Sequence, residues 1–430
     1  MRQRSLPIAI ELDELSRSRS VIAAAQPRWY LTGMASFMLV MGMQSVLLPY
    51  LVTIELHAPA AQVGIAQSAV QWPMLVLLLI GGLIADRVDP RRVLVAVQAF
   101  ATVPPLLLIA VLTTRGISYS LVVVFAVLWG TVSALAMPAR DALLSRVAGL
   151  GVQRVVTVVM ACQFIAQIAG YALASQIDST GAVPVLALQS IAMLLGVVTT
   201  WQIAAAPPLA HGRAGLLTDL AEGLTTLFRA PPMRATFLLA TGLGVFFAGT
   251  FTVLLPLAMR DLFQRGGSGI ALGLFVFMAG MITSILVMML RQRGVQRPGR
   301  AIVISLYLGC AVLIPIYFTP PLWLFYLCIY LWGIGGGVVM TMARTIIQEQ
   351  APASHRARVM AAYALANGGG APFGSLMMGY AIALVGVAHA VLLPILGVIA
   401  TTSWVLFTQD VWQLRSQTAQ SPQPAPVPAR

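Results

Sequence analysis

Long stretches without a charged side chain are the dominant pattern of this chain. A helix that crosses a bilayer needs about 20 mainly apolar residues at a rise of about 1.5 Å per residue. Ten stretches of 22 residues or more contain no Asp, Glu, Lys or Arg: 29–54, 56–85, 93–114, 116–139, 155–177, 179–212, 235–259, 266–290, 301–343 and 359–409. The last two have double length and are broken at 319–321 and around 386–389, so the pattern predicts twelve crossings.

The same pattern predicts where the helices lie and how they are grouped. They are expected near 30–54, 63–85, 92–113, 118–138, 153–177, 184–206, 235–258, 268–290, 300–317, 322–343, 359–384 and 388–408. These segments are apolar on all sides, whereas the helices of soluble proteins carry one apolar stripe. The predicted class is therefore an all-α polytopic membrane protein with six-helix bundles at 29–206 and 235–409.

The segments outside the two bundles are polar or biased in composition. Residues 1–28 are polar and rich in Arg, so we expect a tail rather than a cleavable signal peptide. Residues 410–430 are rich in Pro, Ala and Gln and are expected to be disordered. The linker 207–234 is expected to form an amphipathic helix on the membrane surface, because acidic residues interrupt a run of leucines at helical spacing. Those leucines are Leu216, Leu217, Leu220, Leu224 and Leu227.

The two halves of the chain repeat each other weakly. A shift of 204 residues aligns Arg140 with Arg344 and Gln163 with Asn367. The two arginines both follow the fourth predicted crossing of their half. The match predicts two pseudo-symmetric bundles, and transporters built from repeated halves bind their substrate near the midplane, where the halves meet.

The charges of the chain lie almost entirely between the apolar stretches. The net charge is +13, all 26 basic residues are Arg, and 59% of the residues are hydrophobic. If the N-terminus is cytoplasmic, only Arg115, Arg260 and Arg265 lie outside and 23 arginines lie inside. This bias follows the positive-inside rule, so we expect both termini in the cytoplasm. The absence of Lys beside abundant Ala, Gly and Arg is typical of a high-GC bacterial genome, so the expected location is a bacterial inner membrane. The basic charge is then a topology signal, and nucleic acid is not an expected partner.

One polar motif lies between the second and third predicted crossings, in the segment GLIADRVDPRR at 82–92. It resembles the signature loop of the major facilitator superfamily, usually written G-x-L-A-D-R-x-G-R-R/K. The matching residues are Gly82, Ala85, Asp86, Arg87 and Arg91, followed by Arg92. Asp89 and Pro90 stand where many members have Gly and Arg. The resemblance implies the major facilitator fold and a loop that holds the cytoplasmic side of the bundles together in one state. A positively charged turn that only sets topology is the alternative.

Further segments resemble one branch of that superfamily. The branch contains the bacterial enterobactin (siderophore) exporter and macrolide-type efflux proteins. The segments are 138–142, 222–224, 255–256, 348–360 and 368–374. The resemblance implies export of a small amphiphilic molecule, siderophore-like or drug-like.

Several amides and one indole are candidates for the substrate cavity. An amide without a partner in hydrocarbon costs roughly 2–7 kcal/mol, so polar groups within crossings tend to face the bundle interior or a hydrated cavity. Gln67 and Gln71 share one helix face because they are four residues apart, and Gln163 and Gln167 do the same. The candidates are Gln44, Gln67, Gln71, Gln163, Gln167, Asn367 and Trp129. The alternative is that each amide joins two helices by a hydrogen bond worth about 0.6 kcal/mol.

Two arginines at equivalent helix ends are candidates for a cytoplasmic gate. Arg140 is followed by Asp141, and Arg344 by Glu349 five residues later. A charge network that holds or releases the bundles is one interpretation of these residues. An ordinary interfacial anchor is the other.

All 13 acidic residues lie at predicted helix ends, in loops or in tails. A carboxylate in mid-membrane, which proton-driven exporters of cations often carry, is therefore absent from the pattern. The proton gradient is the expected energy source, and coupling must then be weak or use a boundary carboxylate. The candidates are Asp86, Asp141, Glu55 and Asp178. A cation pathway built on a buried acid is disfavoured, which leaves neutral or anionic amphiphiles as substrates.

The leading interpretation is a monomeric secondary active exporter that works by alternating access, with no cofactor or metal. An importer or a lipid flippase of the same fold stays open, because nothing in the sequence fixes direction. A non-transporting receptor or scaffold is a more distant alternative. An enzyme would need clustered nucleophiles, acids or metal ligands, whereas the crossings hold only scattered Cys162, Cys310 and Cys328 and a marginal His389.

Overall fold

The structure is a computed structural model that describes residues 6–148, 152–205, 216–290, 295–352 and 355–414. The secondary structure of these residues is entirely helical. Helices are the expected solution, because a bilayer offers no water to the backbone and a helix pairs its N–H and C=O groups internally.

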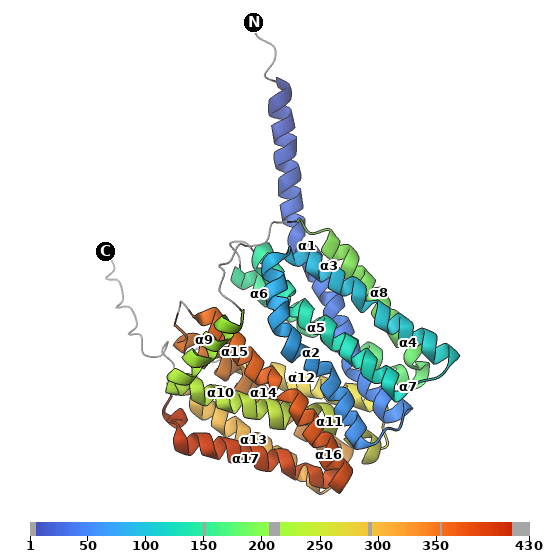
Figure 1. Cartoon of the computed structure of the whole chain (residues 1–430), viewed down its shortest axis with the longest axis vertical. Coiled ribbons are helices and arrows are strands. Elements are labelled where there is room, and N and C mark those ends of the chain that lie inside the picture. Colours follow the sequence, from blue (N-terminus) through green and yellow to red (C-terminus); the bar gives the residue numbers. More distant parts are fainter. Residues whose placement is uncertain (1–5, 149–151, 206–215, 291–294, 353–354, 415–430) are drawn as a thin grey trace.

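The first bundle is built from residues 26–201, and each crossing is one helix or two short ones in series. Its elements are α1 (Leu6–Tyr50) with the π-helical turn η1 (Leu51–Glu55), α2 (Ala60–Arg87), α3 (Pro90–Ala101) with α4 (Val103–Thr114), α5 (Tyr119–Ala148), α6 (Val152–Ala174) with α7 (Ile177–Thr180), and α8 (Ala182–Trp201). Helix α1 begins within the segment expected as a tail, and its first turns project beyond the bundle in Figure 1.

The second bundle follows helix α9 (Leu216–Arg229), which lies in the predicted linker. Its elements are α10 (Pro231–Leu243), the π-helical turn η3 (Gly244–Ala248) and α11 (Gly249–Asp261), then α12 (Gly267–Leu290), α13 (Pro298–Tyr317), α14 (Leu322–Gln350), α15 (Arg356–Gly369), α16 (Ala371–Ala390) and α17 (Leu392–Thr408), with a final turn η4 (Val411–Gln413). Gly386 has a φ of 79°, so the eleventh crossing ends there and the twelfth continues through α17.

The predicted number of crossings is confirmed. Ten helical segments of the described chain are long and apolar enough to cross a membrane. Helix α2, with 28 residues, and the shorter apolar α17 complete the twelve. The predicted breaks at 319–321 and 386–389 are both turns between crossings.

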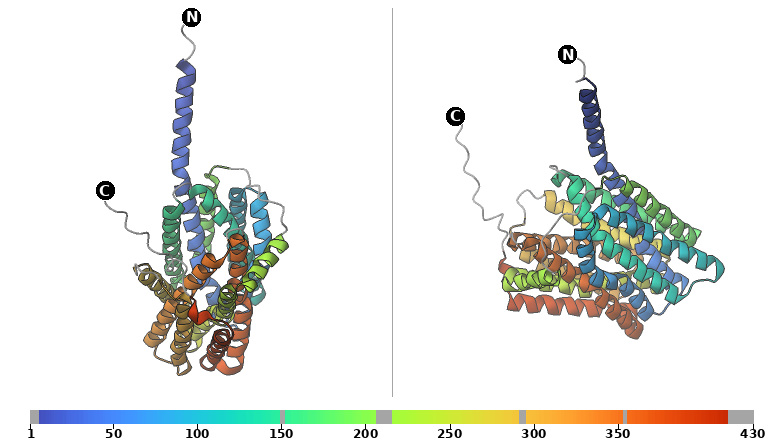
Figure 2. Two further views of the ribbon diagram at one scale, coloured as in Figure 1. Left: turned by 90° about the vertical axis from the view of Figure 1, so that its left-hand side faces the viewer. Right: turned by 45° about the horizontal axis from the view of Figure 1, so that its top comes forward.

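The two bundles meet at one end and diverge toward the other (Figures 1 and 2). The diverging end carries α9, the turn between α2 and α3, and most arginines, and we call it the Arg-rich end. The end where the bundles meet carries the turns at 56–59, 115–118, 262–266 and 318–321, and we call it the Arg-poor end.

Close helix contacts repeat between the bundles. A Cβ at Gly130 of α5 would lie 2.1 Å from the Val70 carbonyl oxygen of α2. A Cβ at Gly333 of α14 would lie 2.2 Å from the Phe277 carbonyl oxygen of α12. Both distances are too short for any side chain, so the second and fourth crossings of each half approach through a glycine, as small residues allow in membranes.

A second repeated feature ties the third crossing of each bundle to the end of its sixth. The Arg91 guanidinium lies 5.0 Å from the centre of the Trp201 ring and donates to the Trp201 carbonyl. The Arg300 guanidinium lies 4.9 Å from the Trp412 ring and donates to the Trp412 carbonyl at 3.1 Å. Each pair combines a cation–π contact with a charged hydrogen bond at the Arg-rich end.

Candidate functional site

A cavity of about 360 Å³ lies between the two bundles. Its first wall comes from α1, α2 and α5, and its second wall comes from α11 and α12. The first wall includes Gln44, Ser45, Gln67, Gln71, Trp129 and Ser133, and the second includes Phe251, Thr252, Leu255, Pro256, Ile270 and Leu274. No charged side chain is among the residues that line it in the described chain. The polar groups are concentrated on the first wall, and the second is mainly apolar.

Three of the predicted amides line this cavity, and each is held differently. Gln67 is buried, and its side-chain amide makes no hydrogen bond to a described side chain. Gln71 donates to the Ser375 hydroxyl at 3.0 Å, which joins α2 to α16 of the other bundle. Gln44 accepts a hydrogen bond of 3.3 Å from Gln189, and its own Nε2 has no partner among the described residues.

The predicted indole also lies at the cavity. Trp129 is buried on α5 and stacks on Phe37 of α1, with ring centres 6.1 Å apart and planes 18° from parallel. The stacking fixes the indole plane within the first bundle, so the cavity has one rigid aromatic surface beside its amides.

Two of the other predicted amides, Gln163 and Gln167, do not line the cavity. Gln163 donates to the Met38 sulfur at 3.4 Å, and Gln167 donates to the Tyr171 hydroxyl at 3.0 Å. The Gln163 contact with α1 matches the alternative interpretation, in which an amide joins two helices, whereas the Gln167 contact stays within α6. The side chain of Asn367 lies outside the described residues. The four-residue spacing identified a shared face, but that face of α6 packs beside α1 rather than against the cavity.

The second wall of the cavity was not predicted. It contains Phe251, which stacks on Phe277 with ring centres 4.3 Å apart and meets the edge of Trp332. Thr252 lies 3.1 Å from the Ser375 hydroxyl. An apolar residue that faces a cavity has the same composition as one that faces lipid, so hydrophobic pattern alone carries no signal for this wall.

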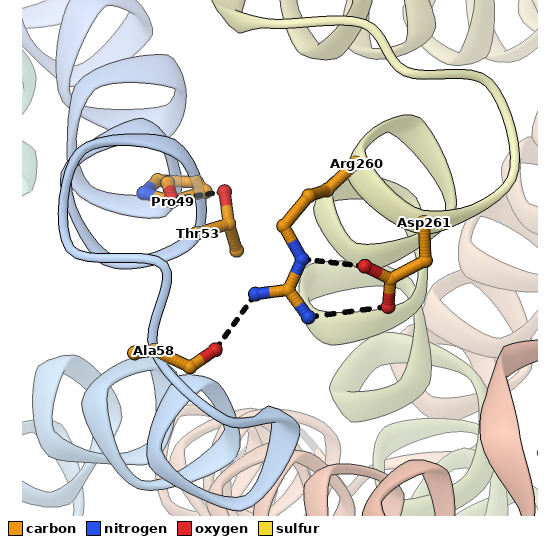
Figure 3. Close-up of polar contacts among 5 residues, drawn as sticks. All are labelled: Pro49, Thr53, Ala58, Arg260 and Asp261. Atoms are coloured by element: carbon orange, nitrogen blue, oxygen red, sulfur yellow. Dashed lines mark hydrogen bonds and ion pairs between the residues drawn. The ribbon is translucent and has the colours of Figure 1, made fainter.

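One contact across the bundles at the Arg-poor end begins with a distortion of the first crossing. The Thr53 hydroxyl donates a hydrogen bond of 2.7 Å to the Pro49 carbonyl, and Thr53 lies in the π-helical turn η1. The chain then turns at His57, whose φ is 46°. This places the Ala58 carbonyl 2.7 Å from Nη1 of Arg260 on α11, and Asp261 accepts from Nε and Nη2 of the same guanidinium (Figure 3).

A second contact across the bundles joins α7 to α12. The Asp178 carboxylate accepts hydrogen bonds from the backbone N–H of Gly267 at 2.7 Å and of Ser268 at 2.9 Å. These N–H groups belong to the first turn of α12, where the helix has no partners of its own and the dipole is positive. The residue before the helix is Gly266, where a Cβ would lie 2.2 Å from a carboxylate oxygen.

A third contact across the bundles joins α2 to α16 through glycine. A Cβ at Gly64 would lie 2.7 Å from the Ser375 carbonyl oxygen and 2.9 Å from the Gly379 Cα. A Cβ at Gly379 would lie 2.7 Å from the Gly64 Cα. The backbones therefore touch directly, and the three contacts together close the Arg-poor end.

At the Arg-rich end, one ion pair lies within the first bundle and another joins the linker helix to the second bundle. Arg146 pairs with the buried Asp89 at 3.0 Å, and Asp89 also accepts from the Arg91 N–H to cap α3. Glu222 of α9 pairs with Arg358 of α15. These bonds stabilise each half without joining the two.

The predicted gate residues are spread over this end. Arg140 lies 3.9 Å from Asp141, and Arg344 of the other bundle acts on that carboxylate electrostatically. Arg92 is exposed, and Arg91 is held against Trp201. The contacts of Gly82, Asp86 and Arg87 lie outside the described part of the chain. A contact of the signature loop with the second bundle therefore stays a prediction.

Comparisons with solved structures agree with this architecture. The nucleoside transporter NupG matches with a TM-score of 0.71 at 12% identity, over 92% of this chain and 100% of that one. A POT family transporter in complex with 5-aminolevulinic acid matches with a TM-score of 0.71 at 13% identity, over 90% of this chain and 96% of that one. An auto-inhibited POT family peptide transporter matches with a TM-score of 0.68 at 14% identity, over 93% and 99%.

The comparison with protein families is more direct. No curated protein matches the chain. The family model described as Major Facilitator Superfamily matches residues 30–375, which is most of the two bundles. Its match agrees with the twelve crossings and with the resemblance of the 82–92 loop. The chain belongs to the major facilitator superfamily and is a membrane transporter rather than an enzyme.

Proposed function

We propose that this transporter exports a small amphiphilic molecule across a bacterial cytoplasmic membrane by alternating access, driven by the proton gradient. The observation that carries the proposal is the cavity between bundles that touch at the Arg-poor end and diverge at the Arg-rich end. A site between two repeated halves that rock against each other is the general arrangement of such carriers.

The orientation in the membrane rests on the arginines. They favour a cytoplasmic Arg-rich end, with both chain termini on that side. The conformation described above is then the one in which the site is shut from the outside. Because the cavity, the contacts between bundles and the repeat all lie within one chain, we propose a monomer as the working unit.

The chemistry of the cavity supports an uncharged amphiphile, of siderophore-like or drug-like size. A charged solute would leave water without a partner of opposite charge, because the described residues that line the cavity carry no charged side chain. Gln67 and the unpaired Nε2 of Gln44 offer hydrogen bonds on one wall. The Phe251 wall offers apolar contact on the other. The branch that contains siderophore and macrolide exporters has substrates of this general character.

Transport into oriented vesicles tests the proposal. Everted membrane vesicles that contain the protein would be energised by a proton gradient and incubated with labelled siderophores, macrolides and lipids. We expect uptake of at least one solute that collapses when the gradient is dissipated and is absent from vesicles without the protein. Uptake only into right-side-out vesicles would identify an importer, and movement of a lipid between leaflets would identify a flippase.

Absence of movement for every solute would favour a receptor or scaffold. A labelling assay tests the proposed orientation independently of any solute. A cysteine at exposed Thr114 would be labelled by an impermeant thiol reagent in intact cells. Labelling only after permeabilisation would overturn the proposed orientation.

A further inference from the structure

We propose that Asp178 is a positioning residue of the transport cycle, because its carboxylate caps α12 from the opposite bundle and so holds the Arg-poor end shut. We also propose that protonation of this carboxylate releases the cap. The inference goes beyond the proposed function and holds for either direction of transport. It needs only that the two bundles separate at this end.

The geometry of the cap is specific. Both carboxylate oxygens of Asp178 are used, one for the Gly267 N–H and one for the Ser268 N–H. Asp178 lies on the first bundle and α12 on the second, so separation of the bundles must break both bonds. Gly266 precedes α12 and has no side chain to cap it, so the helix end would be left without a protein partner.

Comparison of the boundary carboxylates singles out Asp178. Glu55 is exposed at the same end and makes no ion pair or side-chain hydrogen bond with the described residues. Asp141 lies at the other end, has a side chain that is 66% exposed, and pairs with its neighbour Arg140. The side chain of Asp86 lies outside the described residues. Among those described, Asp178 is the boundary carboxylate whose hydrogen bonds cross between the bundles.

The chemistry of the cap depends on its charge. The ionised carboxylate accepts from both N–H groups and matches the positive end of the α12 dipole. The protonated acid has no net charge, and one of its oxygens carries a proton that faces an N–H donor. Acid therefore weakens the closed state, whereas neutral solution favours it. Asp178 is exposed at the rim, so protons reach it from the solution at the Arg-poor end.

The ionisable groups around Asp178 are few. Helices α8 and α12, which pack against α7, carry none. Tyr50 interacts electrostatically with both Glu55 and Asp178, and Arg265 lies in the turn before α12. His57 and His389 lie at the same end, so the test must separate them from Asp178. The proton binds and leaves on one side, so the step moves no proton across the membrane.

The test measures the opening of the Arg-poor end directly. Spin labels at Thr114→Cys and Phe318→Cys, both exposed and on different bundles, report the distance across this end in nanodiscs. The half-buried Cys162 is replaced by Ser so that it does not take a label. We expect a short distance at pH 7.5 and a growing long-distance population as the pH falls to 3.

The Asp178→Asn variant should show the long distance already at pH 7.5, with the open-to-closed ratio raised about tenfold, and should respond little to acid. Gly266→Ala tests the same cap without removing the charge, because the added Cβ displaces the carboxylate. Glu55→Gln, His57→Gln and His389→Gln are matched controls and should keep the response of the unsubstituted protein.

Several results would overturn the proposal. A distance distribution that does not change between pH 7.5 and 3 in the unsubstituted protein would do so without any variant. An Asp178→Asn protein that is closed at pH 7.5, or that keeps the full acid response, would also contradict it. Loss of the response in His57→Gln or His389→Gln would assign the effect to histidine. None of these measurements requires a known substrate, so failure here leaves the proposed export function untouched.

Discussion

Two interfaces between the bundles at the Arg-poor end, which we call seams, are held by different kinds of contact. The seam between α6–α7 and α12 is joined at its rim by the exposed carboxylate of Asp178 and two N–H groups. The seam between α2 and α16 is joined in its interior by backbone contact at Gly64 and Gly379. A charged hydrogen bond at a rim is exchanged readily for water, whereas backbone contact depends only on shape.

The difference assigns separate tasks to the seams. The α2–α16 seam borders the cavity, because Gln67 and Gln71 of α2 line it and Gln71 bonds to Ser375 of α16. The amides of α6, on the other side, are used for packing within the first bundle. We infer that the glycine seam transmits the presence of substrate, while the charged seam responds to the solution outside. The predictions below separate these tasks.

The largest effect is expected from filling the glycine seam. In Gly64→Val the first side-chain carbon alone would lie 2.7 Å from the Ser375 carbonyl oxygen, so the closed Arg-poor end is destabilised. Overpacking of this kind costs about 1–3 kcal/mol, so we expect roughly a tenfold to hundredfold loss of the closed population and of transport. The distance between labels at residues 114 and 318 measures the population.

A matched glycine substitution controls for helix propensity. A Cβ at Gly336 of α14 would lie 3.7 Å from the Phe277 ring, which is ordinary contact. Gly336→Ala should therefore leave the closed population and the melting temperature nearly unchanged. A Gly64→Val protein that closes and transports normally would show that the α2–α16 contact is not required.

A smaller effect is expected at the rim bond of α11. Arg260→Met removes the hydrogen bond to the Ala58 carbonyl and leaves Asp261 without its guanidinium partner. A hydrogen bond of this kind is worth about 0.5–1.5 kcal/mol, so the open-to-closed ratio should rise roughly twofold to tenfold. Arg115→Met, which removes an exposed arginine at the same end, is the control. Equal effects of the two substitutions would mean that net charge, not the Ala58 bond, matters.

A still smaller effect is expected from the hydroxyl–amide bridge of the glycine seam. Gln71 donates to Ser375 at 3.0 Å, while the Ser375 hydroxyl also bonds the Ala371 carbonyl at 3.0 Å. A double-mutant cycle of Gln71→Leu and Ser375→Ala should give a coupling of about 1 kcal/mol in the closed population. Strict additivity would show that the two side chains do not interact in the closed state.

Much of the fold was predictable because the membrane imposes a simple rule. A chain that crosses lipid must form apolar helices of a minimum length, so windows without charge locate the crossings. Breaks within crossings were less visible. The turn η3 that divides α10 from α11 contains no proline, and α1 continues past Pro49 to Tyr50 and then passes into the π-helical turn η1. The Arg91–Trp201 and Arg300–Trp412 pairs were not predictable from the internal repeat, because their positions do not align under a shift of 204 residues.

The site was predictable only in part. Buried amides were found because polar groups are rare in crossings, and Gln44, Gln67 and Gln71 do line the cavity. Which helix face meets the cavity depends on packing between helices, and that information is not contained in a four-residue spacing. The Arg260–Ala58 bond uses a backbone carbonyl, which every residue has, so no residue type marks it.

The last prediction compares one amide from each side of the molecule. Gln67 is buried at the cavity and Gln163 bonds Met38 away from it. Gln67→Leu should raise the KM for a transported solute about fivefold, because one hydrogen bond of about 1 kcal/mol to a polar substrate is lost, with little change in the closed population. Gln163→Leu removes an amide of the same size and should leave KM unchanged. Initial rates of solute uptake into vesicles measure both. If Gln163→Leu raised KM and Gln67→Leu did not, the substrate would lie along α6 instead, and the assignment of tasks to the two seams would be reversed.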